Sequence, residues 1–316
     1  MRIALIAEGC YPYVTGGVSS WVQNLIQELP DAEFDVLAIT ASSDPRQSRY
    51  ELPKNLNQVI DYPLAGQRAK AQPVNLTDED LAVISHWLEM DTVVEDALGL
   101  FADASKLGDA DTFLASEEFY TLIREQYARN HEAVAFLSYY WSWRNMLTPL
   151  LRLLQQPVGQ YDLIQTTATG YAGVLAATMH AKAKTPVILT EHGIYARERE
   201  EDILQTDWLD LTFKPQWIKF FRYLAKLAYH AAEEVITLSL GNQAHQRQGG
   251  ADEKKLALVP NGVRVNELMS LPRHTFDEGA LQIGAIIRMV PIKDIKTLLY
   301  ACAELVTLKI RKHPAK

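Results

Sequence analysis

The sequence predicts an α/β protein whose core is a parallel, doubly wound sheet. Two observations carry this prediction: short apolar segments alternate with helical ones, and turn-forming loops follow several of the apolar segments. Ligands of such sheets bind beyond the carboxyl ends of the strands, so the loops after the strands are the places to look for function. The expected strands cover residues 3–7, 34–40, 58–64, 161–167, 186–190, 233–239 and 256–259.

Helices are expected between these strands. After the first strand, apolar residues from Val18 to Leu29 recur at helical spacing over three turns. A second helix, over residues 171–183, consists mainly of small residues and follows the fourth expected strand. The alternation of strand and helix is typical of units in which parallel strands are joined by a crossover helix.

Residues from about 76 to 157 interrupt this alternation. Thr77 precedes an apolar-periodic run and Asp80 stands three residues later, which resembles a helix-capping box. Bulky side chains fill residues 136–143 and 146–154. Because large apolar residues are mostly buried, we interpret this region as a helical insertion packed on the sheet, with a partner or acceptor surface as the alternative.

Two pairs of carboxylates in the insertion have the spacing of an Asp-x-Asp metal motif. They are Asp78 with Asp80, and Asp109 with Asp111. A metal motif of this kind would be expected after a strand, whereas these pairs lie among expected helices. We therefore interpret them as solvated helix caps.

A Pro260-Asn261-Gly262 turn predicts a hinge between two domains, residues 1–262 and 263–316. Beyond it, residues 281–288 are expected to form a strand. A helix is expected to begin at Asp294, a suitable N-cap, because apolar residues follow at helical spacing. These residues are Ile295, Leu298, Leu299, Cys302 and Leu305.

Composition and charge exclude several classes of protein. The formal net charge of −8 argues against a general nucleic-acid or anionic-membrane surface. Cys10 and Cys302 lie far apart and show no metal-ligand spacing, so a reduced, cytoplasmic protein is expected. The N-terminus carries too short an apolar run for a signal peptide, and no run of about 20 apolar residues predicts a membrane span.

The loop after the first strand contains Gly16 and Gly17, directly before the expected helix. Paired glycines allow a ligand to approach the backbone closely, and a helix N-terminus supplies donors for an anion or a sugar hydroxyl. A plain Gly-Gly turn explains the same residues equally well. The Gly-x-Gly-x-x-Gly arrangement is absent from the sequence, so a nicotinamide-binding domain is unsupported.

The loop after the 186–190 strand reads Glu191-His192-Gly193. A histidine at the carboxyl end of a strand, beside a glycine that lets substrate come close, suits binding of a sugar hydroxyl or of a transferring group. A histidine satisfied by loop carbonyls is the alternative, and without other context it is the better supported one. The remaining histidines are scattered, and none pairs at metal-ligand spacing.

A third loop lies between the expected strand 281–288 and the helix at Asp294. It carries Arg288 and Lys293, five residues apart. Two cations at a strand-to-helix turn, beside the free N–H groups of a helix N-terminus, form a site suited to a diphosphate. An ordinary surface arginine and lysine are the alternative.

Taken together, these loops resemble the retaining glycosyltransferases of family 4, which have the two-domain GT-B fold, and most of all the cytosolic enzymes of Pel exopolysaccharide synthesis. The resemblance covers residues 1 to about 306. It rests on the segments Glu8-Gly-Cys-Tyr-Pro-Tyr-Val-Thr-Gly-Gly-Val-Ser-Ser-Trp21, Tyr140-Trp-Ser-Trp-Arg144, Glu191-His-Gly-Ile-Tyr-Ala-Arg-Glu-Arg199, Val259-Pro-Asn-Gly-Val263 and Arg288-Met-Val-Pro-Ile-Lys293-Asp294.

The resemblance implies a GT-B-type Rossmann-like domain with a helical insertion, joined to the first strand and helix of a second Rossmann-like domain. It also implies transfer of a sugar from a nucleotide-diphosphate donor, a UDP-sugar, to a growing glycan acceptor, with no metal or other cofactor. Arg288 and Lys293 would hold the diphosphate, and His192 would touch the donor sugar as the catalytic residue. Gly16 and Gly17 would line the cleft, with Glu191 and Gly193 in the donor and acceptor site.

The family's Glu-x7-Glu pattern has no counterpart after Lys293, so we expect a truncated form with low or no activity. Two other hypotheses stay open. The chain could be a catalytically silent docking module of an inner-membrane polysaccharide synthase complex, cytoplasmic and membrane-associated only through that partner. It could also be an unrelated Rossmann-type oxidoreductase, against which the missing glycine fingerprint counts.

Overall fold

The computed structural model describes residues 1–66, 70–130, 134–263, 265–272, 282–287, 289 and 293–307. The chain divides into two compact units, Met1–Gly262 and Val263–Lys316, and each is described by itself.

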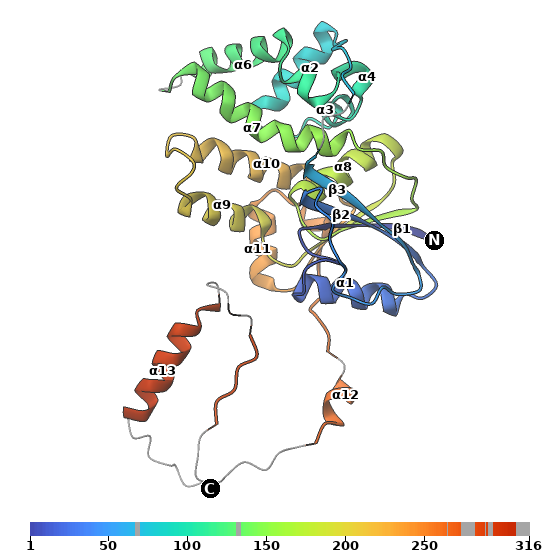
Figure 1. The fold of residues 1–316 in the computed structure, drawn as a ribbon, viewed down its shortest axis with the longest axis vertical. Coiled ribbons are helices and arrows are strands. Elements are labelled where there is room, and N and C mark those ends of the chain that lie inside the picture. The colour runs from blue at the N-terminus through green and yellow to red at the C-terminus, as the bar shows by residue number, and fades with distance from the viewer. Residues whose placement is uncertain are drawn as a thin grey trace. The chain divides into compact units, whose positions relative to one another are not determined.

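The first unit is built on one sheet of seven parallel strands, in the order β3-β2-β1-β4-β5-β6-β7 (Figure 1). The prediction of a doubly wound α/β fold is therefore confirmed. The strands are β1 Arg2–Glu8, β2 Glu33–Ser42, β3 Leu56–Ala65, β4 Leu163–Thr166, β5 Val187–Glu191, β6 Glu234–Thr237 and β7 Leu256–Leu258.

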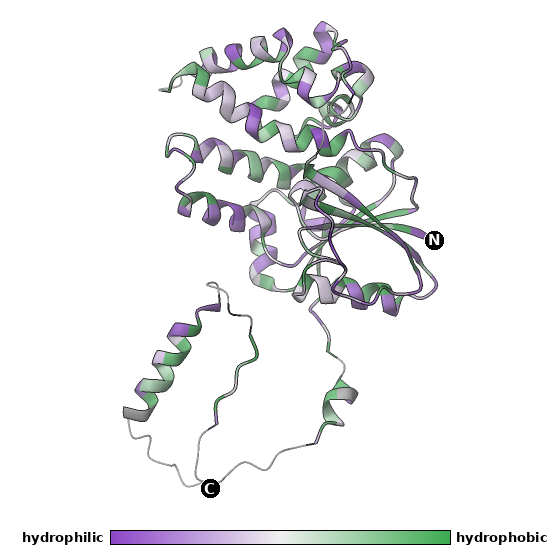
Figure 2. Ribbon diagram, viewed as in Figure 1, coloured by the Kyte–Doolittle hydropathy of each residue, from purple (hydrophilic) through white to green (hydrophobic). Residues whose placement is uncertain are grey.

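Helices flank the sheet on both faces. They are α1 Gly17–Glu28, α8 Tyr171–Ala183, α9 Tyr195–Gln205, α10 Lys214–Ala231 and α11 Leu240–Gln248, with a short 3-10 helix at Glu253–Lys255. Side chains of β1 alternate between two clusters: Ile3 and Leu5 pack with Val22 of α1, whereas Ala4 and Ile6 face a larger cluster that contains α8 and α10. The strands are correspondingly apolar, whereas the outer helix α9 is largely hydrophilic (Figure 2).

The small residues of α8 serve close packing against α10. A Cβ built on Gly173 would lie 2.6 Å from the Cβ of Ala228. This separation is shorter than carbon atoms tolerate, so the two helices approach as closely as they do because position 173 carries no side chain.

The region of the predicted insertion is helical between β3 and β4. Its helices are α2 Asp78–Glu89, α3 Asp96–Phe101, α4 Ala104–Leu107, α5 Ala110–Phe113, α6 Glu117–Asn130 and α7 Phe136–Leu154. Trp87 and Trp143 are fully buried in the same cluster as Ile6 of the sheet. The insertion thus shares the core of the sheet, although Leu137 and Trp141 of α7 remain exposed.

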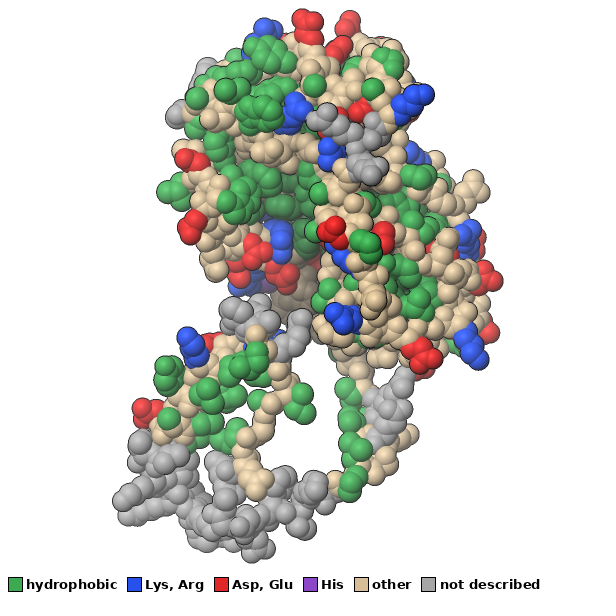
Figure 3. Space-filling model, in the orientation of Figure 1, with side chains coloured by type: hydrophobic (Ala, Val, Ile, Leu, Met, Phe, Trp, Pro, Cys, Tyr) green, Lys and Arg blue, Asp and Glu red, His purple; other side chains and the backbone are tan. Residues whose placement is uncertain are grey.

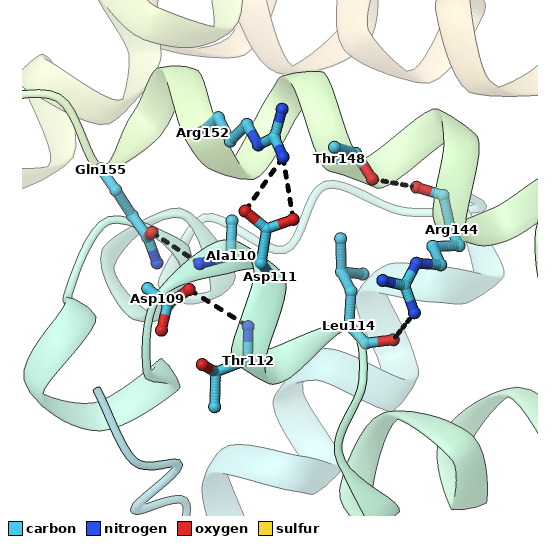
Figure 4. Close-up of polar contacts among 9 residues, drawn as sticks. All are labelled: Asp109, Ala110, Asp111, Thr112, Leu114, Arg144, Thr148, Arg152 and Gln155. Atoms are coloured by element: carbon cyan, nitrogen blue, oxygen red, sulfur yellow. Dashed lines mark hydrogen bonds and ion pairs between the residues drawn. The ribbon is translucent and has the colours of Figure 1, made fainter. Parts of the chain in front are cut away.

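The prediction of solvated helix caps holds for Asp78, which is exposed in the first turn of α2, but not for the other three carboxylates, which are buried or partly buried. Thr77 and Asp80 form the capping box of α2, and Asp80 is only 9% exposed. Asp109 is buried and accepts a hydrogen bond from the Thr112 N–H at 3.1 Å, while Asp111 receives two hydrogen bonds from Arg152 (Figure 4). Hydrogen bonds and packing within the insertion withdraw Asp80, Asp109 and Asp111 from water, which a sequence-based assignment to solvated caps does not anticipate.

The second unit contains α12 Val265–Met269 and α13 Ile295–Thr307. The prediction of a strand over residues 281–288 is wrong for the described residues 282–287, which form no strand. A strand requires a neighbour to pair with its backbone, and none exists among the described residues of this unit. The helix predicted from Asp294 is confirmed, and the Thr297 N–H points to the Asp294 carboxylate at 3.4 Å.

Among the residues that the structure describes, no helix combines the length and the apolarity that crossing a bilayer would require.

Asp35, at the amino end of β2, is fully buried and holds the first strands together. Its Oδ2 accepts hydrogen bonds from Arg2 at 2.5 Å, Gln58 at 2.9 Å and Tyr161 at 3.1 Å. Arg2 belongs to β1 and Gln58 to β3, and Tyr161 lies just before β4. Burial alone would raise the pKa of Asp35, but the hydrogen bonds from Gln58, Arg2 and Tyr161 outweigh it and lower the pKa below its usual value.

Asp35 therefore makes stability depend on pH. A carboxyl with a lowered folded-state pKa stabilises the fold fully above its unfolded value, about 3.9, and loses that contribution as pH falls through the folded value. We expect Asp35→Asn to lower the free energy of unfolding by about 1–3 kcal/mol at pH 7. The difference from the wild type should shrink below about pH 4 in urea titrations. The exposed Asp31→Asn is the control, and a difference independent of pH would contradict the assignment.

Candidate functional site

The order of the sheet defines where a ligand would bind. The chain runs from β1 outward to β2 and β3, then returns to the other side of β1 with β4. At this switch point the loops after β1 and β4 diverge, and the crevice between them is the usual ligand site of doubly wound sheets. Gly16 ends the first of these loops and Gly17 begins α1, while Glu191 ends strand β5 and His192 and Gly193 follow it.

One of the two helix N-termini at the switch point is already occupied. Glu8, the last residue of β1, accepts a hydrogen bond from the Ala172 N–H of α8 at 3.0 Å and from the Tyr195 hydroxyl at 2.7 Å. Burial raises the pKa of Glu8, and these hydrogen bonds oppose that shift. The protein's own carboxylate thus takes the place at α8 that a ligand anion would favour.

The N-terminus of α1 is different. Gly16 is its N-cap, no side chain caps the helix, and its first turn contains no acidic residue. The Gly16 N–H points to the Tyr50 hydroxyl at 3.4 Å. A Cβ built on Gly17 would meet no atom within 4 Å, so the space beside the turn is open. The φ of Gly16 is 172°, an extended value that any residue adopts, so the backbone conformation does not require glycine at this position.

Glu191 is placed in the interior, at the end of β5, and is 1% exposed. Its Oε1 accepts hydrogen bonds from the Thr169 hydroxyl at 3.0 Å and the Tyr195 N–H at 3.1 Å. Its Oε2 accepts from the Tyr229 hydroxyl at 2.7 Å and Gln246 at 3.1 Å. Burial raises the pKa of Glu191, and the four hydrogen bonds counteract it. The carboxylate predicted to bind a ligand is therefore engaged by the protein on both oxygens.

Tyr195 connects the two carboxylates. Its N–H bonds to Glu191 and its hydroxyl to Glu8, so the start of α9 is tied to both β5 and β1. The ring passes against the loop after β4: a Cβ built on Gly170 would lie 2.2 Å from Tyr195 Cζ. Position 170 must therefore be glycine for this ring to occupy its place.

His192 is half-buried beside α1. Its ring meets the ring of Trp21 at a centroid distance of 4.7 Å and an interplanar angle of 74°, an edge-to-face contact. Burial lowers the pKa of His192, so the imidazole is neutral near pH 7. Its Nε2 is buried without a hydrogen-bond partner among the described residues. The main chain of His192 is anchored to α11, because the Asn242 side chain donates to its carbonyl at 3.3 Å.

Gly193 follows at the base of α9. A Cβ at this position would lie 2.1 Å from Glu198 Oε1, the end of a flexible side chain. The carboxyl of Glu198 has a raised pKa, mainly through burial. Gly193 thus leaves room for this carboxyl next to the His192 loop.

The cations of the third loop lie in the second unit. Lys293 is exposed, and Arg288 lies outside the described residues. Their predicted role in holding a diphosphate stays a prediction.

A groove of about 900 Å³ begins two residues beyond His192, at Ile194, and runs between α9, α10 and α11. Ion pairs line it: Arg222 with Glu200 at 2.6 Å, and Lys219 with Asp91 at 2.7 Å. Figure 3 shows hydrophobic side chains gathered between charged ones on the face that carries α9 and α10. Among the described residues, no group of three His, Cys, Asp or Glu side chains could hold a metal ion.

Sequence reasoning gave no separate role to three residues of the site: Glu8, Trp21 and Tyr195. Glu8 had a usable signal, because a carboxylate that ends an apolar strand stands at the carboxyl edge of the sheet. Trp21 had none, since its position fits the apolar face of an amphipathic helix. Its contact with His192 depends on the placement of α1 relative to the loop after β5.

The fold and the switch-point loops define a Rossmann-like α/β protein with a candidate ligand site at the carboxyl edge of its sheet. Residues 1–254 match the family model described as "Domain of unknown function (DUF3492)", and the chain belongs to that family. No curated protein shows a significant match to the chain.

The hydrogen bonds of Glu191 predict a structural cost for its removal. We expect Glu191→Ala to lower the free energy of unfolding by about 3–5 kcal/mol, because four buried donors lose their acceptor. Glu191→Gln should cost less, since it keeps one acceptor oxygen. Urea unfolding at pH 7 measures both. Glu201→Ala, which removes an exposed carboxylate, should stay within about 0.5 kcal/mol of the wild type. An unchanged stability in Glu191→Ala would show that the carboxylate does not hold these elements together.

The two glycines of the switch point should respond differently to an added methyl group. Gly170→Ala forces Tyr195 to move and should cost about 1–3 kcal/mol in unfolding experiments. Gly17→Ala has open space and a helical backbone, so stability should change by less than about 1 kcal/mol. Equal losses in the two variants would contradict this description of the site.

Proposed function

We propose that this protein is a retaining glycosyltransferase of the family 4 type. It would transfer a sugar from a nucleotide-diphosphate donor, a UDP-sugar, to a growing exopolysaccharide such as that of the Pel system. The observation that carries the proposal is the pairing, at one edge of a doubly wound sheet, of an uncapped helix start at Gly16 and Gly17 with the half-buried His192. Both lie in the segments that resemble the family.

In this proposal the N–H groups at the start of α1 favour an anionic group of the donor. The resemblance to family 4 assigns the binding of its diphosphate to Arg288 and Lys293. The bond between the anomeric carbon and the diphosphate oxygen breaks as a bond forms to an acceptor hydroxyl oxygen, whose proton passes to the departing UDP or to water. Donors fixed around the diphosphate would stabilise the charge that develops on UDP. No metal ion or other cofactor takes part in the proposed reaction.

His192 would contact the donor sugar. A neutral imidazole presents one donor and one acceptor, which suits sugar hydroxyls. A buried polar atom without a partner, such as Nε2 of His192, is costly and is found most often where a ligand, water or ion completes the structure. The groove that includes Ile194 is the proposed path of the glycan acceptor, because Ile194 lies two residues beyond His192 in the chain and the groove carries paired charges that can exchange partners with hydroxyl groups.

A docking module of an inner-membrane polysaccharide synthase complex is the second candidate. Exposed aromatic side chains on the first unit favour it: Trp208 is 71% exposed and Trp141 is 48% exposed. In this case the protein would be cytoplasmic and would reach the membrane only through its partner.

Calorimetric titration of the full chain with UDP, and with UDP-glucose, UDP-galactose and UDP-N-acetylglucosamine, tests the proposal. We expect UDP to bind, and at least one UDP-sugar to bind more tightly than UDP. Arg288→Ala should weaken both by about tenfold or more, because one charge-assisted contact to the diphosphate is lost. Gly17→Ala should weaken both without loss of stability.

NADH serves as the control ligand, and its binding in place of UDP would favour the oxidoreductase hypothesis. A folded chain that binds none of the uridine nucleotides would contradict the donor site. Capture by a polysaccharide synthase complex without nucleotide binding would support the docking module instead.

A further inference from the structure

The contact between Trp21 and His192 joins two loops that are remote in sequence. Trp21 stands one turn into α1, the helix that begins at Gly17, and His192 follows β5. Their edge-to-face contact at 4.7 Å is the ring contact recorded for His192 among the described residues. Trp21 itself is partly buried and packs on the cluster formed by α1 and β1. The indole is therefore held in place by the core and presents a fixed surface to the imidazole.

Part of the His192 ring is buried, and the indole of Trp21 packs against the ring. Its Nε2 has no partner, and burial is the only cause of its lowered pKa, so no charged side chain among the described residues contributes. An imidazolium needs an acceptor for each of its two N–H groups. Because a proton on Nε2 would have none, the packing around the ring selects the neutral form.

Trp21 is thus not needed for the helix, where any large apolar residue would fit, but its ring is matched to the imidazole. A tilted aromatic pair is stabilised by contact of a ring edge with a ring face, which fixes the angle as well as the distance. An aliphatic side chain at position 21 would present no ring to the imidazole, so it would leave the angle of the His192 ring free.

We propose that Trp21 is a positioning residue for the sugar transfer proposed above: its indole, in edge-to-face contact with His192, fixes the orientation of the imidazole for contact with the donor sugar. The predicted effect of Trp21 on binding of the UDP-sugar rests on the proposed function. The predicted effect of Trp21 on the His192 ring does not, and it can be tested without any ligand.

The first test is the titration of His192 by NMR in the full chain labelled at its histidines, with His192→Gln used to assign the resonance. The wild type should titrate below the ordinary value of about 6.5. Trp21→Phe should keep that behaviour, because it keeps a ring. Trp21→Ala should raise the midpoint toward about 6.5 and shift the ring resonances, since water reaches the imidazole. Should Trp21→Ala fail to fold, Trp21→Leu keeps a smaller apolar side chain at this position, and the ring resonances of His192 should still shift.

Trp208→Ala is the matched control. Trp208 is exposed and pairs with Trp217, so its loss should leave the His192 resonance unchanged. An unchanged midpoint and unchanged ring resonances in a folded Trp21→Ala or Trp21→Leu protein would overturn the inference.

The second test separates this inference from the proposed function. In Trp21→Ala, UDP should bind as in the wild type, whereas the UDP-sugar that the wild type binds most tightly should lose about tenfold in affinity, the equivalent of one oriented hydrogen bond. Trp21→Phe should recover most of the loss. An equal change for UDP and UDP-sugar would overturn the positioning role, and absence of all nucleotide binding in the wild type would overturn the proposed function while the NMR result on the rings still stands.

Discussion

The buried carboxylate of Glu191 is the interaction on which the carboxyl edge of the sheet depends. Its four donors come from the loop after β4 and from α9, α10 and α11. A buried carboxylate without such partners would be strongly destabilising. The acid therefore fixes where these elements start and end, and through Tyr195 it also fixes Glu8 and β1.

This arrangement gives the two helix N-termini at the switch point different roles. The start of α8 is neutralised by Glu8 from within the protein, which locks the loop after β4 against β1. The start of α1 has no such side chain and faces open space at Gly17. One side of the crevice is therefore rigid and the other side is accessible. Rigid neighbours allow a loop to present a ligand site with little reorganisation.

The helical insertion extends the same core rather than forming a separate one. Trp87 and Trp143 lie in the cluster that contains Ile6 of β1, so α2 and α7 belong to the same hydrophobic core as the sheet. The insertion also lends Asp91 to the groove beside α10. Its position therefore shapes one wall of the surface next to the His192 loop.

Local patterns in the sequence predicted the strands of the first unit and its helices α1 and α8. Apolar runs at β1 and β5 and helical spacing in α1 record local burial, and they predicted the parallel sheet correctly. They also predicted that Gly16, Gly17 and His192 lie at one edge of the sheet, because the carboxyl ends of parallel strands lie together. Three features could be found only in the folded structure. Glu191 is buried, Trp21 contacts His192, and residues 282–287 form no strand. The reason is physical: periodicity reports which face of an element is buried, whereas side-chain partners and strand pairing depend on neighbours that are distant in the chain.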